Sequence, residues 1–327
     1  MSNNKVKLDD IYKINSYISY PTVFVLCLGY LFWLGALVLG LYYNYNWYCT
    51  LPLSTIGCYI CFTPLHDATH GSICKNKHIN EIAGTISGIP FFFAPFKTFK
   101  LIHLRHHAYT NDPENDPDYY SGAGSPTLLP LRWFTMVGHY YYYFFRILFD
   151  TLSKKVDKFN SIRDGSLCHD AKQIYNVTKD NKFIKYLALV LESLAIILFN
   201  WGVLIYSFFK GNFYNTFILW VLPSFFTITI LAYLFDYIPH RPHDGEKHMD
   251  IHKNTNMTDG FFGLNNGKSN ILLDIITFNQ TSYHNIHHLY PWIPFYKYGE
   301  IWRKYKKKLI KRGTPIQSLF GKEKINK

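Results

Sequence analysis

Eight histidines in three short clusters are the residues of this chain best suited to chemistry. The clusters read His66-Asp67-Ala68-Thr69-His70, His103-Leu104-Arg105-His106-His107 and His284-Asn285-Ile286-His287-His288. Spacings of three and four residues place side chains on one face of a helix, where imidazole rings can converge on a metal ion. The clusters hold more nitrogen ligands than a single ion needs. The sequence therefore predicts an enzyme in which two metal ions share one catalytic histidine site, with His66, His70, His103, His106, His107, His284, His287 and His288 as the ligands.

Asp236 and His240 form a further candidate pair, because they lie where an apolar segment ends. Ionisable groups at such a depth usually have a partner and a function. We expect His240 to be a ninth metal ligand. Asp236 could hold a metal-bound water or orient an imidazole. An ion pair of Asp236 with Arg241 or Arg105 is the purely structural alternative.

The segment Asn111–Asp118 places carboxylates beside the second cluster. Its prolines forbid a continuing helix and fix a turn. Asp112 and Asp116 could therefore accept the second ring N–H of a ligating histidine, and so could Asp67. A solvated acidic turn is the alternative. His139 stands alone in an aromatic stretch, where a polar contact is the commoner role than metal ligation.

The ligand set does not identify the metal, since neutral imidazole binds iron, zinc, copper and nickel. The six cysteines lack the clustering of an iron–sulfur centre or a structural zinc site. Cys58 and Cys61 have two residues between them but lie in an apolar segment, which indicates buried helix positions. His243, His248 and His252 follow in a polar loop, where exposure to solvent is expected.

Four segments are long and apolar enough to cross a bilayer, which takes about 20 residues each. They cover about residues 21–43, 47–65, 185–209 and 213–238. The turns inside each pair are very short, so the chain predicts two membrane hairpins with all long connections on one side. The expected fold is an all-α, multi-pass integral membrane protein with a single domain over residues 1–327 and a helical cap that carries the histidines.

The positive charge is concentrated at the flanks of these apolar segments. The formal net charge is +12, yet no Lys or Arg lies between Lys13 and Lys75. This distribution is typical of a membrane protein with a positive, cytoplasmic side, and it places the histidine clusters on that side. No basic face with interleaved aromatic residues is visible, so nucleic-acid binding is not expected.

Four connecting segments complete the expected organisation. Residues 82–102 are apolar and interrupted by Gly and Pro, so they would dip into the membrane without crossing it. Residues 128–149 are aromatic and predict a helix in the membrane interface. Residues 153–181 are polar and predict a soluble excursion, and residues 301–312 predict a basic surface helix.

The three clusters resemble the signature of the membrane fatty acid desaturase and hydroxylase superfamily. That signature is the set H-x-x-x-H, H-x-x-H-H and H-x-x-H-H, and the resemblance covers roughly residues 50–300. Within the superfamily the sequence is most similar to carotenoid ring hydroxylases of the β-carotene 3-hydroxylase type. The strings that carry this likeness are His66–His70, Asn111–Asp118, Phe235–Pro242 and His287–Tyr298.

The resemblance implies two non-haem irons, with O2 as a co-substrate that oxidises an unactivated C–H bond. It also implies a lipophilic substrate taken from the bilayer and electrons from a small donor such as a ferredoxin or cytochrome. Hydroxylation of a carotenoid ring is the first interpretation. Desaturation of a fatty acyl lipid is the alternative, because the same ligands serve both outcomes. A membrane metal-binding protein without turnover is a minor third possibility.

Overall fold

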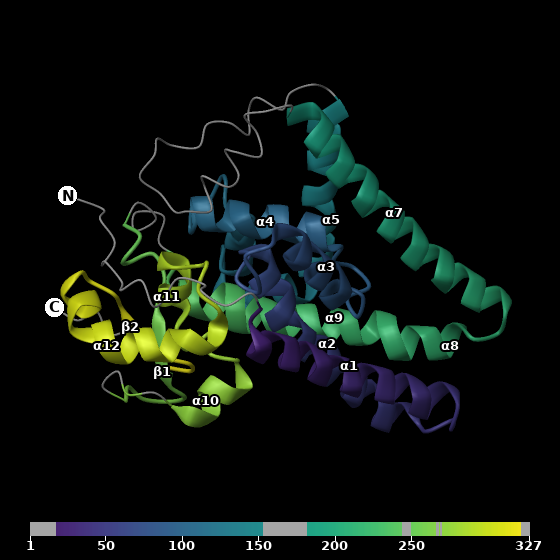
Figure 1. Ribbon diagram of the computed structural model, residues 1–327, viewed down its shortest axis with the longest axis horizontal. Helices are drawn as coiled ribbons and strands as arrows, with labels where there is room; N and C mark the ends of the chain where they lie inside the picture. The colour runs from purple at the N-terminus through teal and green to yellow at the C-terminus, as the bar shows by residue number, and fades with distance from the viewer. Residues whose placement is uncertain (1–17, 153–181, 244–249, 266–267, 269, 322–327) are drawn as a thin grey trace.

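The computed structural model describes residues 18–152, 182–243, 250–265, 268 and 270–321. The described chain is mostly helical, and its elements follow one another as Figure 1 labels them. The predicted soluble excursion at 153–181 and the loop residue His248 lie outside the described residues.

Four helices are long and apolar enough to cross a membrane, as hydropathy predicted. They are α1 (Tyr20–Leu41), α2 (Trp47–Thr69), the Leu189–Phe209 part of α7 (Lys182–Phe209), and the run Phe213–His240. The short turns that join α1 to α2 and α7 to α8 lie at the same end of the molecule (Figure 1). The hairpin arrangement follows from these two turns.

The fourth of these helical runs is irregular. It consists of α8 (Phe213–Thr216), a π-helical turn η5 (Phe217–Val221), α9 (Leu222–Leu231), a second π-helical turn η6 (Ala232–Tyr237) and a 3-10 turn η7 (Ile238–His240). Pro223 has no N–H to bond the carbonyl of Leu219, one turn earlier. That carbonyl accepts the Ser54 hydroxyl instead, at 2.6 Å. The second π turn carries Asp236 and leads to His240.

A middle layer crosses the ends of the long helices (Figure 1). It contains α3 (Lys77–Gly88), α4 (Phe96–Tyr109) and α5 (Leu129–Leu152), with 3-10 turns η2 (Pro117–Ser121) and η3 (Pro126–Leu128) between α4 and α5. The predicted helix at 128–149 corresponds to α5. The stretch 82–102 is two helices joined by a bend at residues 89–95, and this bend turns α4 back toward the end of α2.

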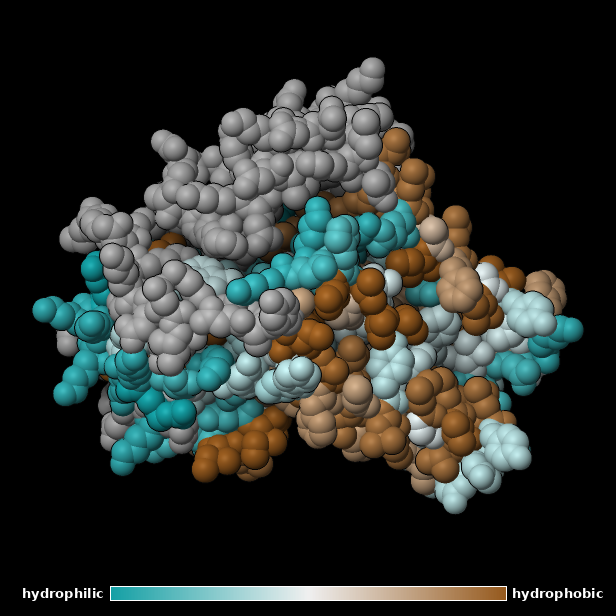
Figure 2. Space-filling view, in the orientation of Figure 1, coloured by the Kyte–Doolittle hydropathy of each residue, from teal (hydrophilic) through white to brown (hydrophobic). Residues whose placement is uncertain are grey.

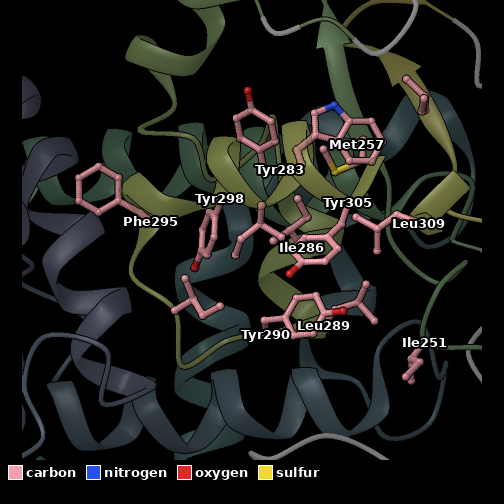
Figure 3. Packing of buried hydrophobic residues seen from close by; sticks show 14 of the residues in the cluster. Ile251, Met257, Tyr283, Ile286, Leu289, Tyr290, Phe295, Tyr298, Tyr305 and Leu309 are labelled. Atoms are coloured by element: carbon pink, nitrogen blue, oxygen red, sulfur yellow. The ribbon is translucent and has the colours of Figure 1, made fainter. Parts of the chain in front are cut away.

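The C-terminal part packs the third histidine cluster into a core of aromatic and aliphatic side chains. It comprises β1 (Met257–Gly260), α10 (Ile271–Ile276), α11 (His284–Leu289), η9 (Phe295–Lys297), α12 (Tyr298–Lys311) and β2 (Ile316–Ser318). Figure 3 shows Ile286 and Leu289 of α11 among Tyr283, Tyr290 and Tyr305. The basic run at 301–312 is a helix, as predicted, and it buries its apolar face in this core.

The two short strands β1 and β2 were not expected in an all-α fold. They pair in parallel, with Met257 opposite Ile316 and Thr258 opposite Gln317. The pair ties the end of the chain to the segment that precedes α11.

Apolar and polar side chains are concentrated on different parts of the surface. In Figure 2 brown, apolar surface predominates over the half of the molecule that holds α1, α2, α7 and α8, and teal surface lies around α12 and in a band across the upper middle of the molecule. Large side chains such as Leu31, Leu198 and Phe209 are exposed on this apolar half. Such a contiguous apolar surface fits a membrane protein.

The α1–α2 hairpin depends on two glycines that let the helix backbones touch. A Cβ at Gly57 would lie 2.5 Å from the backbone nitrogen of Trp33 and 2.8 Å from the carbonyl oxygen of Gly29. Small residues at such crossings allow the close van der Waals packing that holds membrane helices together.

We expect Gly57→Ala to lower the free energy of unfolding by about 1–3 kcal/mol, because its methyl group must push the two backbones apart. Thermal unfolding in detergent micelles measures the change. Gly35→Ala on α1 is the matched control, since a Cβ at Gly35 meets nothing within 4 Å. Equal midpoints for the two variants would contradict the close approach.

Candidate metal centre

The histidines form two buried groups. One group contains His66, His70, His103, His107 and His287, and the other contains His106, His240, His284 and His288. In each group the ring nitrogens that could bind a metal lie within 4.8 Å of one another. The structure thus brings together all nine histidines that the sequence singled out as ligands.

Helix geometry explains how two clusters of the same spacing serve both groups. On α4, His103 and His107 are four residues apart and face the first group, whereas His106 faces the second. On α11 the roles are exchanged: His284 and His288 face the second group, and His287 faces the first. At 3.6 residues per turn, residue i+4 lies about 40° around the helix from residue i and residue i+3 about 60° in the other direction, so residues i+3 and i+4 point to opposite sides of residue i. His107 and His288 stack at 4.1 Å where the groups meet.

The spacing of the nitrogens matches a coordination shell. In the first group the Nε2–Nε2 distances are 3.0 Å for His70–His103, 3.1 Å for His103–His107, 2.8 Å for His107–His287 and 3.1 Å for His66–His287. With metal–imidazole bonds of about 2.1 Å, two ligands at a right angle lie about 3.0 Å apart. The distances are those of neighbouring ligands around one ion.

Hydrogen bonds alone cannot account for this arrangement. A ring nitrogen either donates one N–H or accepts through one lone pair. Nε2 of His103, His107 and His287 each lies within 3.1 Å of two other Nε2 atoms. In the second group, Nε2 of His284 lies 3.0 Å from Nε2 of both His240 and His288. A cation between the rings would satisfy every lone pair at once, so the donor set fits a metal in each group.

The outer ring nitrogens of His106, His287 and His284 have partners of their own. Nδ1 of His106 lies 2.8 Å from Oδ1 of Asp116, and Nδ1 of His287 lies 3.0 Å from the Tyr298 hydroxyl. Nδ1 of His284 faces the carbonyl oxygen of Gln280 at 3.3 Å. A partner on Nδ1 fixes the tautomer that leaves the Nε2 lone pair for the metal.

Burial sets the protonation of these rings. It lowers the pKa of His103, His107, His287 and His288 well below the usual range, and neighbouring imidazoles lower it further. His106 differs: burial lowers its pKa, but the charges of Asp116 and Asp118 outweigh this and raise it. Rings with lowered pKa values stay neutral at physiological pH, which is the form that binds metals.

Comparison with known proteins identifies the family. The family model described as fatty acid desaturase matches residues 45–320. The chain belongs to the fatty acid desaturase family. Desaturases are oxidoreductases, so membership of this family identifies the chain as an oxidoreductase enzyme.

Three relatives illustrate the range of similarity. The chain is 25% identical over 255 residues to dihydrorhizobitoxine desaturase from Bradyrhizobium elkanii, which covers 76% of this chain and 65% of that protein. It is 36% identical over 90 residues to the sn-1 oleoyl-lipid 12-desaturase from Synechocystis sp., a match to 25% of each chain. It is 41% identical over 46 residues to the chloroplastic omega-6 fatty acid desaturase from Arabidopsis thaliana, or 14% of this chain and 10% of that protein.

These matches span less than two thirds of the length of each relative. All three relatives are named as desaturases. The expected likeness to carotenoid ring hydroxylases therefore finds no support in them, and fatty acyl desaturation, the alternative, gains some.

Within this desaturase-family chain, carboxylates lie beside the second histidine group. Oδ2 of Asp118 is 3.6 Å from Nδ1 of His106, behind the closer contact of Asp116. The Tyr140 hydroxyl lies 3.3 Å from Oδ1 of Asp118 and 3.5 Å from Oδ2 of Asp236. Burial raises the pKa of Asp118 to about 7, against the opposing effect of His106. Asp236 thus belongs to a partly buried carboxyl–phenol network that borders the second group.

The other candidates lie outside the two groups. Asp112 accepts the N–H of Glu114 and that of Asn115 within its own turn. Asp67 accepts the Thr22 hydroxyl at 2.9 Å. His139 stacks on Tyr120 at 4.2 Å. The structure shows these polar contacts for Asp112, Asp67 and His139, and a role of these residues toward a metal stays a prediction.

Two expectations about the polar loop were wrong. His243 and His252 were expected to be exposed, but they are 6% and 3% exposed. His243 stacks with Tyr237 at 5.4 Å, so this ring packs against the helical turn that carries Asp236. No periodic pattern in the sequence predicts this contact, because it depends on tertiary packing.

Tyr298, Thr110 and Gln280 were missed as site residues. The hydroxyl of Thr110 lies 3.3 Å from Nδ1 of His288. Tyr298 contacts His287 and the carbonyl oxygen of Gln280 faces His284, so each ring of the third cluster contacts one of the three residues. Gln280 and Thr110 lie three or four residues from a cluster, a spacing that could have identified them.

An apolar cavity ends at the histidines. We call it the histidine cavity: one end is formed by His66, His103, His106 and His284 with Asp118, Tyr140 and Asp236, and the other by Phe62, Leu65, Phe91, Ala94, Phe99, Ile228, Leu231 and Phe235. Its lining combines apolar walls with a few polar groups, as ligand pockets do, but its volume of about 40 Å³ is far below the roughly 300 Å³ of a small-molecule site.

Asp116→Asn tests the contact that orients His106. The neutral amide is a weaker acceptor than the carboxylate for the Nδ1–H of a metal-bound His106, and in one of its two orientations it offers an N–H instead of an acceptor. We expect metal affinity at the second group to fall about 10- to 100-fold. Competition with a chelator, followed by metal analysis of the purified protein, measures this.

Glu114→Gln is the matched control, because Glu114 belongs to the same turn and is exposed. It should retain metal as the unchanged protein does. Equal metal retention by the Asp116 and Glu114 variants would show that the His106–Asp116 contact has no such role.

Proposed function

We propose that this protein is a membrane-bound, non-haem di-iron desaturase that uses O2 to introduce a double bond into the acyl chain of a lipid. One observation carries the proposal: two buried groups of imidazoles close the polar end of an otherwise apolar cavity. The desaturase names of the relatives support the choice of reaction.

One iron would be held by each histidine group, with His66, His70, His103, His107 and His287 around the first and His106, His240, His284 and His288 around the second. Two bound irons would supply the reduction of O2 to water, with two electrons from the C–H bonds of the substrate and two from an external donor. Nine imidazole nitrogens and no thiolate in these groups suit iron, although imidazole alone does not select it.

The protein's own side chains would position the substrate and exclude water. Phe62, Phe91 and Phe99 line the apolar end of the histidine cavity and would hold a hydrocarbon chain. The Tyr140 hydroxyl would keep a proton between the Asp118 and Asp236 carboxyl groups, at the edge of the second group. Under this proposal the carbon atoms that react would lie beside the histidines, at the end of the cavity that also holds Tyr140, Asp118 and Asp236.

An electron donor must reach the site from the water side. We propose an acidic ferredoxin or cytochrome, because α12 displays Lys304, Lys307 and Lys308 on the surface opposite to its buried face. Charge complementarity steers such encounters. By the positive-inside pattern, this side and the histidine groups would face the cytoplasm.

Hydroxylation of a carotenoid ring is the second candidate. The strings Phe235–Pro242 and His287–Tyr298 favour it, and both border the histidine groups through Asp236, His240 and Tyr298. The same oxidation of a C–H bond would then end with oxygen retained in the product instead of a double bond.

Expression in a β-carotene-producing host tests both candidates together. We expect new unsaturated acyl chains by gas chromatography and an unchanged pigment profile. The His106→Ala variant should insert into the membrane normally and form no product, because it lacks a ring of the second group.

The other outcomes identify the rival functions. Hydroxylated carotenoids with unchanged acyl chains would replace desaturation by ring hydroxylation. An iron-loaded protein that consumes no O2 with either substrate would indicate metal binding without turnover.

A further inference from the structure

The short helix α10 presents a row of large aliphatic side chains to the outside of the molecule. Four of its six residues are exposed by 45–74%, namely Ile271, Leu272, Ile275 and Ile276. The carboxylate of Asp274 turns toward the core, because it accepts the Tyr283 hydroxyl at 3.1 Å. Figure 2 shows α10 as a brown patch at the lower left of the molecule. Exposing such a row of side chains to water is unfavourable in proportion to its apolar area.

The position of α10 indicates what covers this row. The Tyr59 hydroxyl of α2 donates to the carbonyl oxygen of Ile276 at 2.9 Å, and α2 is one of the candidate membrane spans. Ile56, about one turn before Tyr59, is 45% exposed, whereas residues 60–69 of α2 are all buried. The helix α10 therefore lies where the exposed side of this span ends, so the apolar surfaces of α2 and α10 are neighbours.

Two aromatic rings extend this apolar surface. Phe262 and Phe320 stack at 5.2 Å and are 82% and 54% exposed. Each ring directly follows a residue, Phe261 or Leu319, that packs in one apolar cluster with Leu273 of α10. The exposed rings therefore emerge close to α10. Aromatic and aliphatic side chains are the residues that interfacial helices place among lipid chains.

The inner side of α10 is connected to the metal centre. Leu273 packs with Ile238, which lies in the same 3-10 turn as His240. The Asp274 contact holds Tyr283, which directly precedes His284 in the chain. A membrane contact of α10 would therefore fix two of the segments that supply histidines.

We propose that α10 is an interfacial membrane anchor, whose four exposed aliphatic side chains lie among the acyl chains of the leaflet on the histidine side. The lipid is here a structural partner and not a substrate, so the anchor does not depend on the reaction at the metal centre. A soluble protein on this face would have to share the space with the bilayer around Ile56 and Tyr59. A lipid surface therefore fits α10 better than a protein partner.

Photocrosslinking in phosphatidylcholine vesicles tests the anchor. The photoreactive residue p-benzoylphenylalanine, which attacks nearby C–H bonds, replaces Leu272 in one variant and Ile275 in another. After illumination, mass spectrometry should find lipid adducts at both positions. The positive control carries the residue at Leu198, which is 69% exposed on a candidate span, and should also form adducts. The negative control carries it at Lys307, exposed on α12, and should form none.

Hydrogen exchange in the same vesicles gives a second readout without a probe. In the double variant Ile271→Ser, Ile275→Ser, the amides of residues 271–276 should exchange at least about tenfold faster, because two large side chains no longer leave water for lipid. Serine and isoleucine have similar helix propensities, so the same change on a water-exposed helix would have little effect. The double variant Ile79→Ser, Ile82→Ser on α3 is the matched control, and it should leave exchange in α10 unchanged.

Three results would overturn the anchor. The first is lipid adducts at position 198 but none at 272 and 275, or equal adducts at 307. The second is a crosslink from 272 or 275 to another copy of the chain, which would make α10 a protein interface. The third is unchanged exchange in α10 of the Ile271→Ser, Ile275→Ser variant, which would mean that these side chains already face water.

Discussion

The structure depends on the convergence of nine imidazole nitrogens on two points. Neutral rings that aim their lone pairs at one another repel, and one nitrogen cannot satisfy two neighbours by hydrogen bonding. A cation in each group would remove both problems, so metal binding would stabilise the fold. This explains why α2, α4, α11 and the end of the fourth span all meet here, and why Asp116 and Tyr298 hold the outer ring nitrogens in place.

The membrane gives the second constraint, because under the proposed function an apolar substrate would have to reach a site made of polar rings. The long helices expose apolar surface on one half of the molecule, and the histidines lie where α2 and the fourth span end (Figures 1 and 2). The histidine cavity joins the two regions, with hydrocarbon walls toward the helices and imidazoles at its inner end.

Local patterns predicted what depends on local geometry. Hydropathy located the four long helices, and the spacing of the clusters predicted their facing rings, since both follow from the helix repeat. The assignment of His106 and His287 to the group opposite to their cluster mates was not predictable, because it depends on how α4 and α11 are rotated against each other. Tertiary packing likewise produces the burial of His243 and the contact of Tyr298 with His287. It also produces the pairing of the short strands β1 and β2, which begin at Met257 and Ile316.

Metal counting tests the central claim most directly. Elemental analysis of the purified protein should find two irons per chain, one for each histidine group. His107→Ala, in the first group, and His284→Ala, in the second, should each lose about one iron and keep the other, because the groups share no ligand. A single iron in the unchanged protein, or full iron content in both variants, would contradict a centre built from two separate imidazole groups.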